Sequence, residues 1–154
     1  MVQYLRRAAR WPLASTRRTP ELMNYFLRCP GASWSAALLL HRGVPRGWYV
    51  LSRVGGQVRL ADLWVDSERS SDWTIAYSLA LRSARRDPAA CELVAAASIP
   101  PAIEGASRAG LQFRRSDPIF LLDPRKLLAS ASLNVTPIES DLAYLDDPSY
   151  PYLT

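Results

Sequence analysis

The spacing of hydrophobic and polar residues divides the first half of the chain into one helix and three strands. Thr19-Pro20-Glu21 is typical of a helix start, because threonine accepts from free amides and proline fits the first turn, so we expect a helix from there to Leu27. The apolar run at residues 34–40 is too short for most helices and predicts a strand. Residues 47–54 and 57–65 flank a pair of glycines and predict two strands joined by a two-residue turn.

The next part of the chain predicts two helices with a strand between them. Residues 72–86 show the apolar spacing of a helix that is largely buried. The apolar segment at residues 91–97 predicts a strand that is buried on both faces. Ser98-Ile99-Pro100-Pro101 favours a second helix start, and Gly110 suits the position just after its end.

After that helix, residues 111–115 and 119–123 predict two short strands, and a short helix is expected through Leu128. The order α-β-β-β-α-β-α-β-β predicts an α/β fold of the mixed α+β kind. Its central sheet would have antiparallel N-terminal strands, then β-α-β-α-β-β, with helices on both faces. We expect three parts. Residues 1–18 would be a basic leader or linker helix, residues 19–128 the central domain, and residues 129–154 an irregular tail packed on that domain.

Composition limits the classes of protein that the chain can belong to. The 154 residues, 49% of them hydrophobic, suit one globular domain, and no run approaches the ~20 apolar residues that a membrane-spanning helix needs. The formal net charge of +5 lies in residues 1–18, because basic and acidic residues are equal in number beyond them. A nucleic-acid binder usually carries its charge across the folded body, so nucleic acid is not the expected partner.

The two ends of the chain leave several interpretations open. Residues 1–18 are rich in arginine and contain no acid, which fits a helix resting on anionic lipid or nucleic acid, a mitochondrial transit peptide, or a linker packed on the domain. No secretory segment is recognisable, so a cytoplasmic location is expected. Residues 147–152 combine proline and tyrosine and fit either a docking motif or a segment that packs back on its own domain.

The chain is poor in metal-ligating residues. Two separated cysteines, Cys29 and Cys91, exclude a disulfide scaffold and a multi-cysteine zinc site. The single histidine, His41, excludes the usual two-histidine metal motifs. We therefore expect no metal site, with both cysteines as packing thiols and His41 exposed at a strand end.

Three local features, taken in order, point to a family. They are the hairpin running into Leu63-Trp64-Val65, the long helix from Asp72, and residues 102–113 with Gly110-Leu111 at the helix end. This order resembles the GNAT (acyl-CoA N-acyltransferase) superfamily over residues 20–125. The resemblance implies a GNAT-like fold and acetyl-CoA or another acyl-CoA as cofactor.

The resemblance also implies where the cofactor binds. The pantetheine arm would lie along the strand end, and the loop opening the long helix would hold the pyrophosphate on its backbone amides. Serine, aspartate and threonine stand where that loop has glycines, and Asp72 or a serine is expected to cap the helix amides. The residues that the resemblance assigns to cofactor binding are Leu63, Trp64, Val65, Arg69, Ser70, Ser71, Asp72, Trp73 and Thr74.

Two carboxylates are candidates for the catalytic base. Asp62 interrupts an apolar strand, and counting back from the glycine turn places it opposite Tyr49. Loss of hydration would raise the pKa of Asp62 toward the range in which a carboxylate can remove a proton from an amine. A hydrogen bond from the Tyr49 hydroxyl would instead give Asp62 a structural role. Asp66, at the strand end, is the second candidate or a loop cap. The position of the family's acid tyrosine is Ala106.

The expected function is transfer of an acyl group from acyl-CoA to an amine substrate. The alternative is a noncatalytic domain of the same fold that serves protein association or supports a second acyltransferase domain. A second GNAT-like domain or a homodimer is the expected protein partner in either case.

Overall fold

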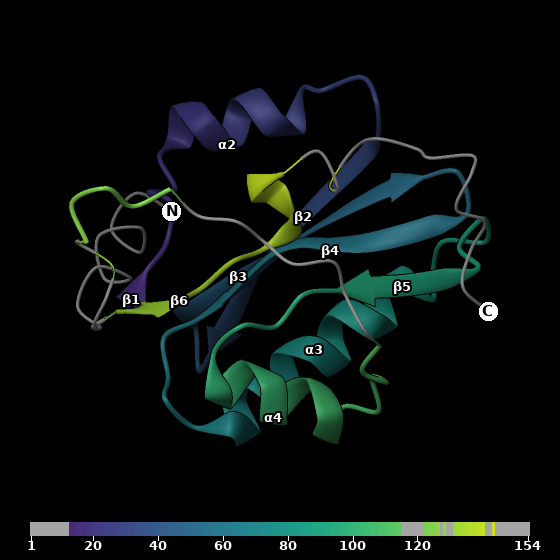
Figure 1. Ribbon diagram of the computed structural model, residues 1–154. Helices are drawn as coiled ribbons and strands as arrows, with labels where there is room; N and C mark the ends of the chain where they lie inside the picture. Colours follow the sequence, from purple (N-terminus) through teal and green to yellow (C-terminus); the bar gives the residue numbers. More distant parts are fainter. Residues whose placement is uncertain (1–12, 115–121, 127, 129–130, 141–142, 144–154) are drawn as a thin grey trace.

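The computed structural model of the chain describes residues 13–114, 122–126, 128, 131–140 and 143 (Figure 1). Most of the leader and the proline- and tyrosine-rich segment at residues 147–152 lie outside the described residues. Within the described part no helix is long and apolar enough to cross a membrane. The elements in chain order are β1 (Leu13–Ala14), α2 (Pro20–Leu27), β2 (Ser33–His41), β3 (Val44–Val54), β4 (Gln57–Val65), α3 (Ser70–Ala84), β5 (Glu92–Ala95), α4 (Pro100–Arg108), β6 (Ser132–Leu133) and the short 3₁₀ helix η2 (Pro137–Glu139).

A four-stranded mixed sheet forms the centre of the molecule. Its strand order is β2-β3-β4-β5, with antiparallel pairing from β2 to β4 and parallel pairing between β4 and β5. Figure 1 shows α2 and η2 on one side of this sheet and α3 and α4 on the other. The predicted class, a mixed sheet covered by helices on both faces, is confirmed at this level.

Two tight turns set the register of the antiparallel strands. The predicted turn at Gly55-Gly56 joins Val54 to its partner Gln57, and Gly55 adopts a positive φ of 56°. A second turn of the same length, Arg42-Gly43, joins β2 to β3 with φ values of 50° and 77°. Because this turn is so short, β3 begins at Val44, three residues before the predicted strand.

A β-bulge changes the register in the second half of β4. Leu60 lies opposite Leu51, but Asp62 lies opposite Val50, so Ala61 is the extra residue. The predicted pairing of Asp62 with Tyr49 is therefore wrong, because a continuous count from the turn passes over this bulge. Tyr49 lies opposite Leu63 instead.

Helices α3 and α4 pack closely against each other. α3 begins two residues before the predicted start, and its buried side includes Trp73, as its apolar spacing predicts. A side chain on Gly105 of α4 would lie 2.5 Å from the Trp73 Cβ atom and 2.9 Å from the Thr74 nitrogen. Glycine at this position therefore allows α4 to approach the first turn of α3. Gly110 follows α4 with a φ of 88°, as predicted for a residue after a helix end.

Several predictions for the second half of the chain are wrong. β5 is shorter than predicted and half-buried, because it lies at the edge of the four-stranded sheet, and Cys91 before it is exposed. Residues 111–114 form no strand, and a turn at Pro124-Arg125 replaces the predicted helix. Residues 115–121, which include most of the last predicted strand, are outside the described part.

Both terminal segments contact the body of the domain. β1 pairs in parallel with β6, and Ser52 of β3 donates its hydroxyl to the carbonyl oxygen of Ala143. Ile138 and Ala143 are fully buried. The described part of the tail is thus packed on the domain.

Two tyrosines of the core differ in how their hydroxyl groups are satisfied. The Tyr49 hydroxyl lies 2.7 Å from the Ser83 hydroxyl of α3. The Tyr77 side chain is 1% exposed, and burial alone raises the pKa of its hydroxyl well above the ordinary value. Among the described residues no hydrogen bond to the Tyr77 hydroxyl is found.

We expect opposite effects when each hydroxyl is removed. Tyr49→Phe should lower the free energy of unfolding by about 1 kcal/mol, because Ser83 loses its partner, whereas Tyr77→Phe should leave it unchanged or raise it slightly. Urea denaturation of the two variants measures both effects. A Tyr77→Phe protein that is less stable than Tyr49→Phe would contradict this assignment.

Candidate functional site

The Asp62 carboxylate is buried at the centre of β4, with 2% of its surface exposed. Arg18 donates to both of its oxygens, from Nη2 to Oδ1 at 3.0 Å and from Nε to Oδ2 at 3.2 Å. Trp48 donates its Nε1 to Oδ2 at 2.8 Å, and Thr136 donates its hydroxyl to Oδ1 at 3.0 Å. Each oxygen therefore accepts two hydrogen bonds, which is the arrangement of a structural carboxylate and leaves no open approach for an amine.

Arg18 connects this carboxylate to both terminal segments. Besides Asp62, its guanidinium donates to Glu139 at 3.0 Å, to the Thr16 carbonyl at 2.9 Å and to the Thr136 hydroxyl at 2.8 Å. Burial lowers the pKa of Arg18, but the charges of Asp62 and Glu139 raise it by more, so the net direction is upward. We call the set Arg18, Asp62, Thr136 and Glu139 the buried clamp.

Glu139 closes the clamp on the side of the C-terminal segment. Its carboxylate accepts from the Thr16 amide at 3.1 Å and from the Thr136 amide at 2.8 Å. Burial raises the pKa of Glu139, but these hydrogen bonds and the charge of Arg18 lower it by more, so the net pKa lies below its ordinary value.

The second candidate base, Asp66, lies where β4 ends. Its amide donates to the Arg46 carbonyl at 2.7 Å, and its carboxylate lies 3.9 Å from the Arg46 guanidinium. The side chain is 22% exposed. Of the two candidates, Asp66 is thus the one that solvent reaches.

The turn between β4 and α3 is held together by Ser67. Its hydroxyl donates to the Asp72 carboxylate at 2.5 Å and accepts from the Arg69 amide at 3.1 Å, and its carbonyl accepts from Trp73 Nε1 at 2.8 Å. The predicted role of Asp72 as a cap on the helix amides is therefore wrong. Its carboxylate is held by an upstream hydroxyl, which offers a closer partner than the backbone does.

The first turn of α3 carries no side-chain cap. The N-cap position is Arg69, an extended residue that makes no capping hydrogen bond, and the helix proper begins at Ser70. The first amides of a helix have no partner within the helix and lie at the positive end of its dipole. Ser71 and Arg69 are exposed, while Ser70 is half-buried. Two of these amides already have partners, because the Arg69 amide donates to the Ser67 hydroxyl and the Asp72 amide donates to the Arg69 carbonyl at 3.0 Å. The amides of Ser70 and Ser71 are therefore the ones that an anion could reach, next to the carboxylate of Asp72.

The residues assigned to cofactor binding divide into two groups. Leu63, Trp64, Val65 and Trp73 are buried, so only their backbone could face a ligand. Arg69, Ser70, Ser71, Asp72 and Thr74 are exposed or half-buried around the turn. The structure thus brings Asp66 and the whole 69–74 segment together at one end of β4 and separates them from the clamp around Asp62.

The strands next to this turn are paired over only part of their length. Pairing between β4 and β5 ends at Leu60 and Ala95, although β4 continues to Val65. The C-terminal segment passes beside this point, because the Val135 amide donates to the Ser98 hydroxyl at 2.8 Å and Thr136 contacts β4. The C-terminal segment therefore lies beside β4 at Asp62, just past the last residue that pairs with β5.

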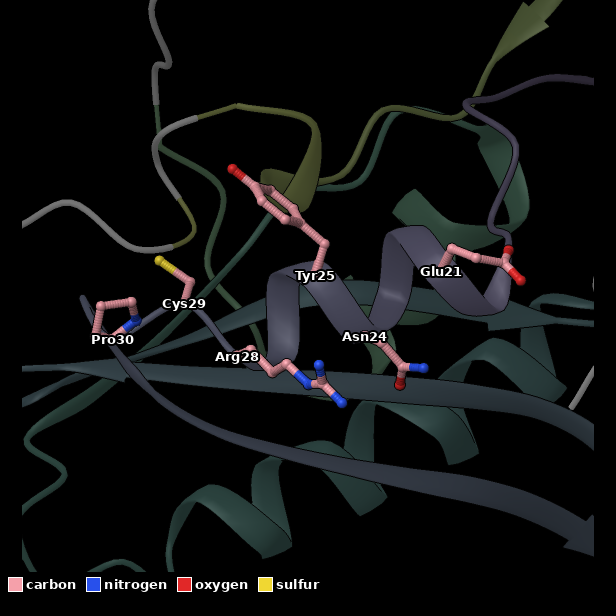
Figure 2. Close-up of a pocket in the computed structure, with 6 residues that line it drawn as sticks. All are labelled: Glu21, Asn24, Tyr25, Arg28, Cys29 and Pro30. Carbon is pink, nitrogen blue, oxygen red and sulfur yellow. The ribbon is translucent and has the colours of Figure 1, made fainter.

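A pocket of about 560 Å³ lies elsewhere, along α2 and the loop after it. Figure 2 shows the side chains that line it, which are Glu21, Asn24, Tyr25, Arg28, Cys29 and Pro30. It is on the opposite side of the sheet from α3 (Figure 1), and the spacing of residues did not predict it. Outside this pocket, His41 is exposed, as expected for the end of a strand.

Comparison of the chain with known protein families, with curated proteins and with solved structures finds no match in any of the three. Across the described ranges, no group of three or more histidine, cysteine, aspartate or glutamate residues is placed to hold a metal ion.

The buried clamp predicts how stability depends on pH. Because the pKa of Glu139 is lower in the folded protein than its ordinary value of 4.5, the unfolded chain takes up this proton first as the pH falls. The stabilisation from Glu139 is complete above that value and is lost as the pH falls through the lower folded pKa. Urea denaturation of wild type and Glu139→Gln should give a difference in unfolding free energy that is constant near neutral pH and shrinks in acid. A difference that grows toward acid would contradict the clamp.

Proposed function

We propose that this domain binds an acyl-CoA at the β4–α3 turn and transfers the acyl group to an amine. The observation that carries the proposal is the start of α3, which follows the end of a strand directly and has no side-chain cap. Free amides at the positive end of a helix bind phosphate groups. The exposed Arg69 at the N-cap adds a cation beside them.

The order of the elements supports the same proposal. Three antiparallel strands, α3, the parallel strand β5 and α4 follow one another as the GNAT resemblance expects. In that arrangement the pyrophosphate lies on the first turn of α3, and the pantetheine arm follows the backbone of Leu63 and Val65 beyond the last β4–β5 pair. Gly105, which brings α4 close to this turn, positions the second helix beside the proposed site.

The chemistry would use Asp66 rather than Asp62. The amine nitrogen attacks the thioester carbonyl, the carbon–sulfur bond breaks, and the products are an amide and the free thiol of coenzyme A. The nitrogen gives up one proton, which Asp66 accepts in this proposal through intervening water because its carboxylate is partly exposed at the strand end, and the same proton returns through water to the leaving thiolate. Asp62 already accepts four hydrogen bonds and would keep its structural role throughout.

A noncatalytic acyl-CoA-binding domain is the second candidate. The C-terminal segment favours it, because Thr136 lies against Asp62 beside the part of β4 that an acceptor amine would have to reach. Ala106, in the position of the family's acid, also favours it, since its side chain cannot protonate a leaving thiolate.

Proline at position 70 tests the binding site through its backbone. Ser70→Pro removes one amide, yet it fits the first position of a helix after the extended Arg69, just as Pro20 does after Thr19 in α2. We expect coenzyme A to bind at least about tenfold more weakly, because a hydrogen bond to a charged group contributes about 1.5–3 kcal/mol. Ser70→Ala keeps the amide and should bind like wild type.

Calorimetry and thermal unfolding with coenzyme A provide the measurement. Wild type at 100 times the dissociation constant should gain about 2.7 kcal/mol in unfolding free energy. Absence of any gain with coenzyme A, acetyl-CoA and longer acyl-CoAs would contradict both candidates, as would equal binding by Ser70→Pro and wild type.

Acyl transfer to an amine then separates the two candidates. If the domain is an enzyme, Asp66→Asn should lose turnover while keeping its stabilisation by coenzyme A. Glu68 is an exposed carboxylate in the same turn, and Glu68→Gln should keep both. Binding without turnover by wild type, over a range of amines, would establish the noncatalytic domain instead.

A further inference from the structure

A β-bulge in β3 places Arg46 beside the point where β4 ends. Leu39 of β2 pairs with Gly47, whereas Leu40 pairs with Pro45. Arg46 lies between these two pairs and is the extra residue of the bulge. Bulges are frequent next to functional sites, because the extra residue changes the direction in which a side chain points. The Arg46 side chain, 52% exposed, therefore has a direction that a regular strand would not give it.

The backbone of Arg46 is held closely against β4. The Asp66 amide donates to the Arg46 carbonyl at 2.7 Å, so the two residues lie opposite each other just beyond the last listed pair of the strands, Gly47 and Val65. A side chain on Gly47 would overlap the carbonyl oxygen of Trp64. Glycine at this position lets the strands approach, and the spacing of Arg46 and Asp66 is therefore set by the backbone.

The charged groups of Arg46 and Asp66 are close together but are not joined by a hydrogen bond. The Arg46 Nη1 atom lies 3.9 Å from the Asp66 Oδ2 atom, beyond the roughly 3.2 Å limit of an N–H···O hydrogen bond. Both side chains reach solvent, and an exposed ion pair of this kind contributes little to stability. A ligand that carries its own charges can therefore contact both groups without disturbing the fold.

We propose that the acceptor amine is an α-amino acid, with Arg46 binding its carboxylate and Asp66 facing its amino group. This inference rests on the proposed acyl transfer and names the substrate class. A guanidinium can donate to both oxygens of a carboxylate in parallel. One carbon separates the amino nitrogen from the carboxylate in an α-amino acid. Neighbouring opposite charges on the protein would thus meet neighbouring opposite charges on the substrate.

The charges around the turn disfavour other classes of amine. A polyamine would place a second positive charge near Arg46 or near the exposed Arg69, which follows Asp66 in the same turn. A simple alkylamine would contact Asp66 but would leave Arg46 without a role in binding.

The amino group of an amino acid is an ammonium ion near neutral pH and releases one proton to solvent before it attacks the thioester. The carbon–nitrogen bond then forms as the carbon–sulfur bond breaks. The second proton reaches Asp66 through water and returns to the thiolate. The products are an N-acyl amino acid, the free thiol of coenzyme A and the proton released to solvent.

Calorimetry of the full chain with the standard free amino acids tests the substrate class. For an amino acid that binds, the matched amine without the carboxylate should bind at least tenfold more weakly, because the contact with Arg46 is lost. The matched acid without the amino group should also bind at least tenfold more weakly. For leucine these two probes are isopentylamine and isocaproate. Absence of binding by every amino acid, or equal binding by the matched amine, would overturn the inference.

Two arginine variants test the residue assigned to the carboxylate. Arg46→Gln should bind the amino acid at least tenfold more weakly than wild type, and no better than the matched amine. Arg42→Gln changes an exposed arginine in the adjacent β2–β3 turn and should bind like wild type. Circular dichroism confirms that both variants are folded. Unchanged binding by Arg46→Gln, or the same loss in Arg42→Gln, would show that Arg46 and Asp66 form a cross-strand ion pair only.

Parallel titrations with coenzyme A separate this inference from the proposed function. Stabilisation of wild type by coenzyme A without binding of any amino acid would overturn the amino-acid inference alone. Amino-acid binding that depends on Arg46, in a protein that coenzyme A does not stabilise, would support the amino-acid site and contradict the acyl transfer. With both ligands bound and acetyl-CoA as donor, Arg46→Gln should raise the KM for the amino acid at least tenfold, and an unchanged KM would overturn the assignment.

Discussion

A single buried carboxylate constrains the arrangement of this domain. Asp62 lies in the middle of the sheet, and a charge there is tolerated only when donors surround it. Those donors come from three places in the chain: Arg18 before α2, Trp48 in β3 and Thr136 in the C-terminal segment. Removing one partner of such a buried pair typically costs about 3–5 kcal/mol, so the same contacts that satisfy the charge also hold both terminal segments on the sheet.

Because of this constraint, the middle and the end of β4 have different roles. The middle of β4 is committed to the clamp, whereas its end carries Asp66 and opens onto an uncapped helix start. A ligand with phosphate groups would meet amides and Arg69 there without disturbing the buried charges. The proposed acyl-CoA site therefore depends on the clamp for its rigid support but not for its reacting groups.

The sequence predicts this fold where the signals are local. Thr19 and Pro20 define the start of α2, the glycines of the β3–β4 turn define a hairpin, and the spacing of α3 reveals its buried side. The sequence does not reveal the bulge at Ala61, because an alanine fits a regular strand as well as a bulge. For the same reason the register of Asp62 is misjudged by one residue.

The candidate site is predicted less well than the fold, for a physical reason. Two of the three partners of Asp62 are 44 and 74 positions away, and nothing in the local pattern marks Arg18 or Thr136 as its donors. Asp72 is misassigned because Ser67, five residues upstream, competes successfully with the backbone amides. The local pattern locates the β4–α3 turn correctly. The hydrogen bonds of the carboxylates in this turn and in β4 depend on how the chain folds, so the local pattern does not reveal them.

Hydrogen exchange of Asp62→Asn tests most directly whether one carboxylate holds both terminal segments. The predicted result is that amides of residues 16–19 and 134–139 lose protection together, while those of β2 and β3 stay protected. Asp66→Asn, on the same strand but outside the clamp, should change neither segment. Loss of protection in only one segment, or in neither, would contradict the clamp as the organising interaction of the domain.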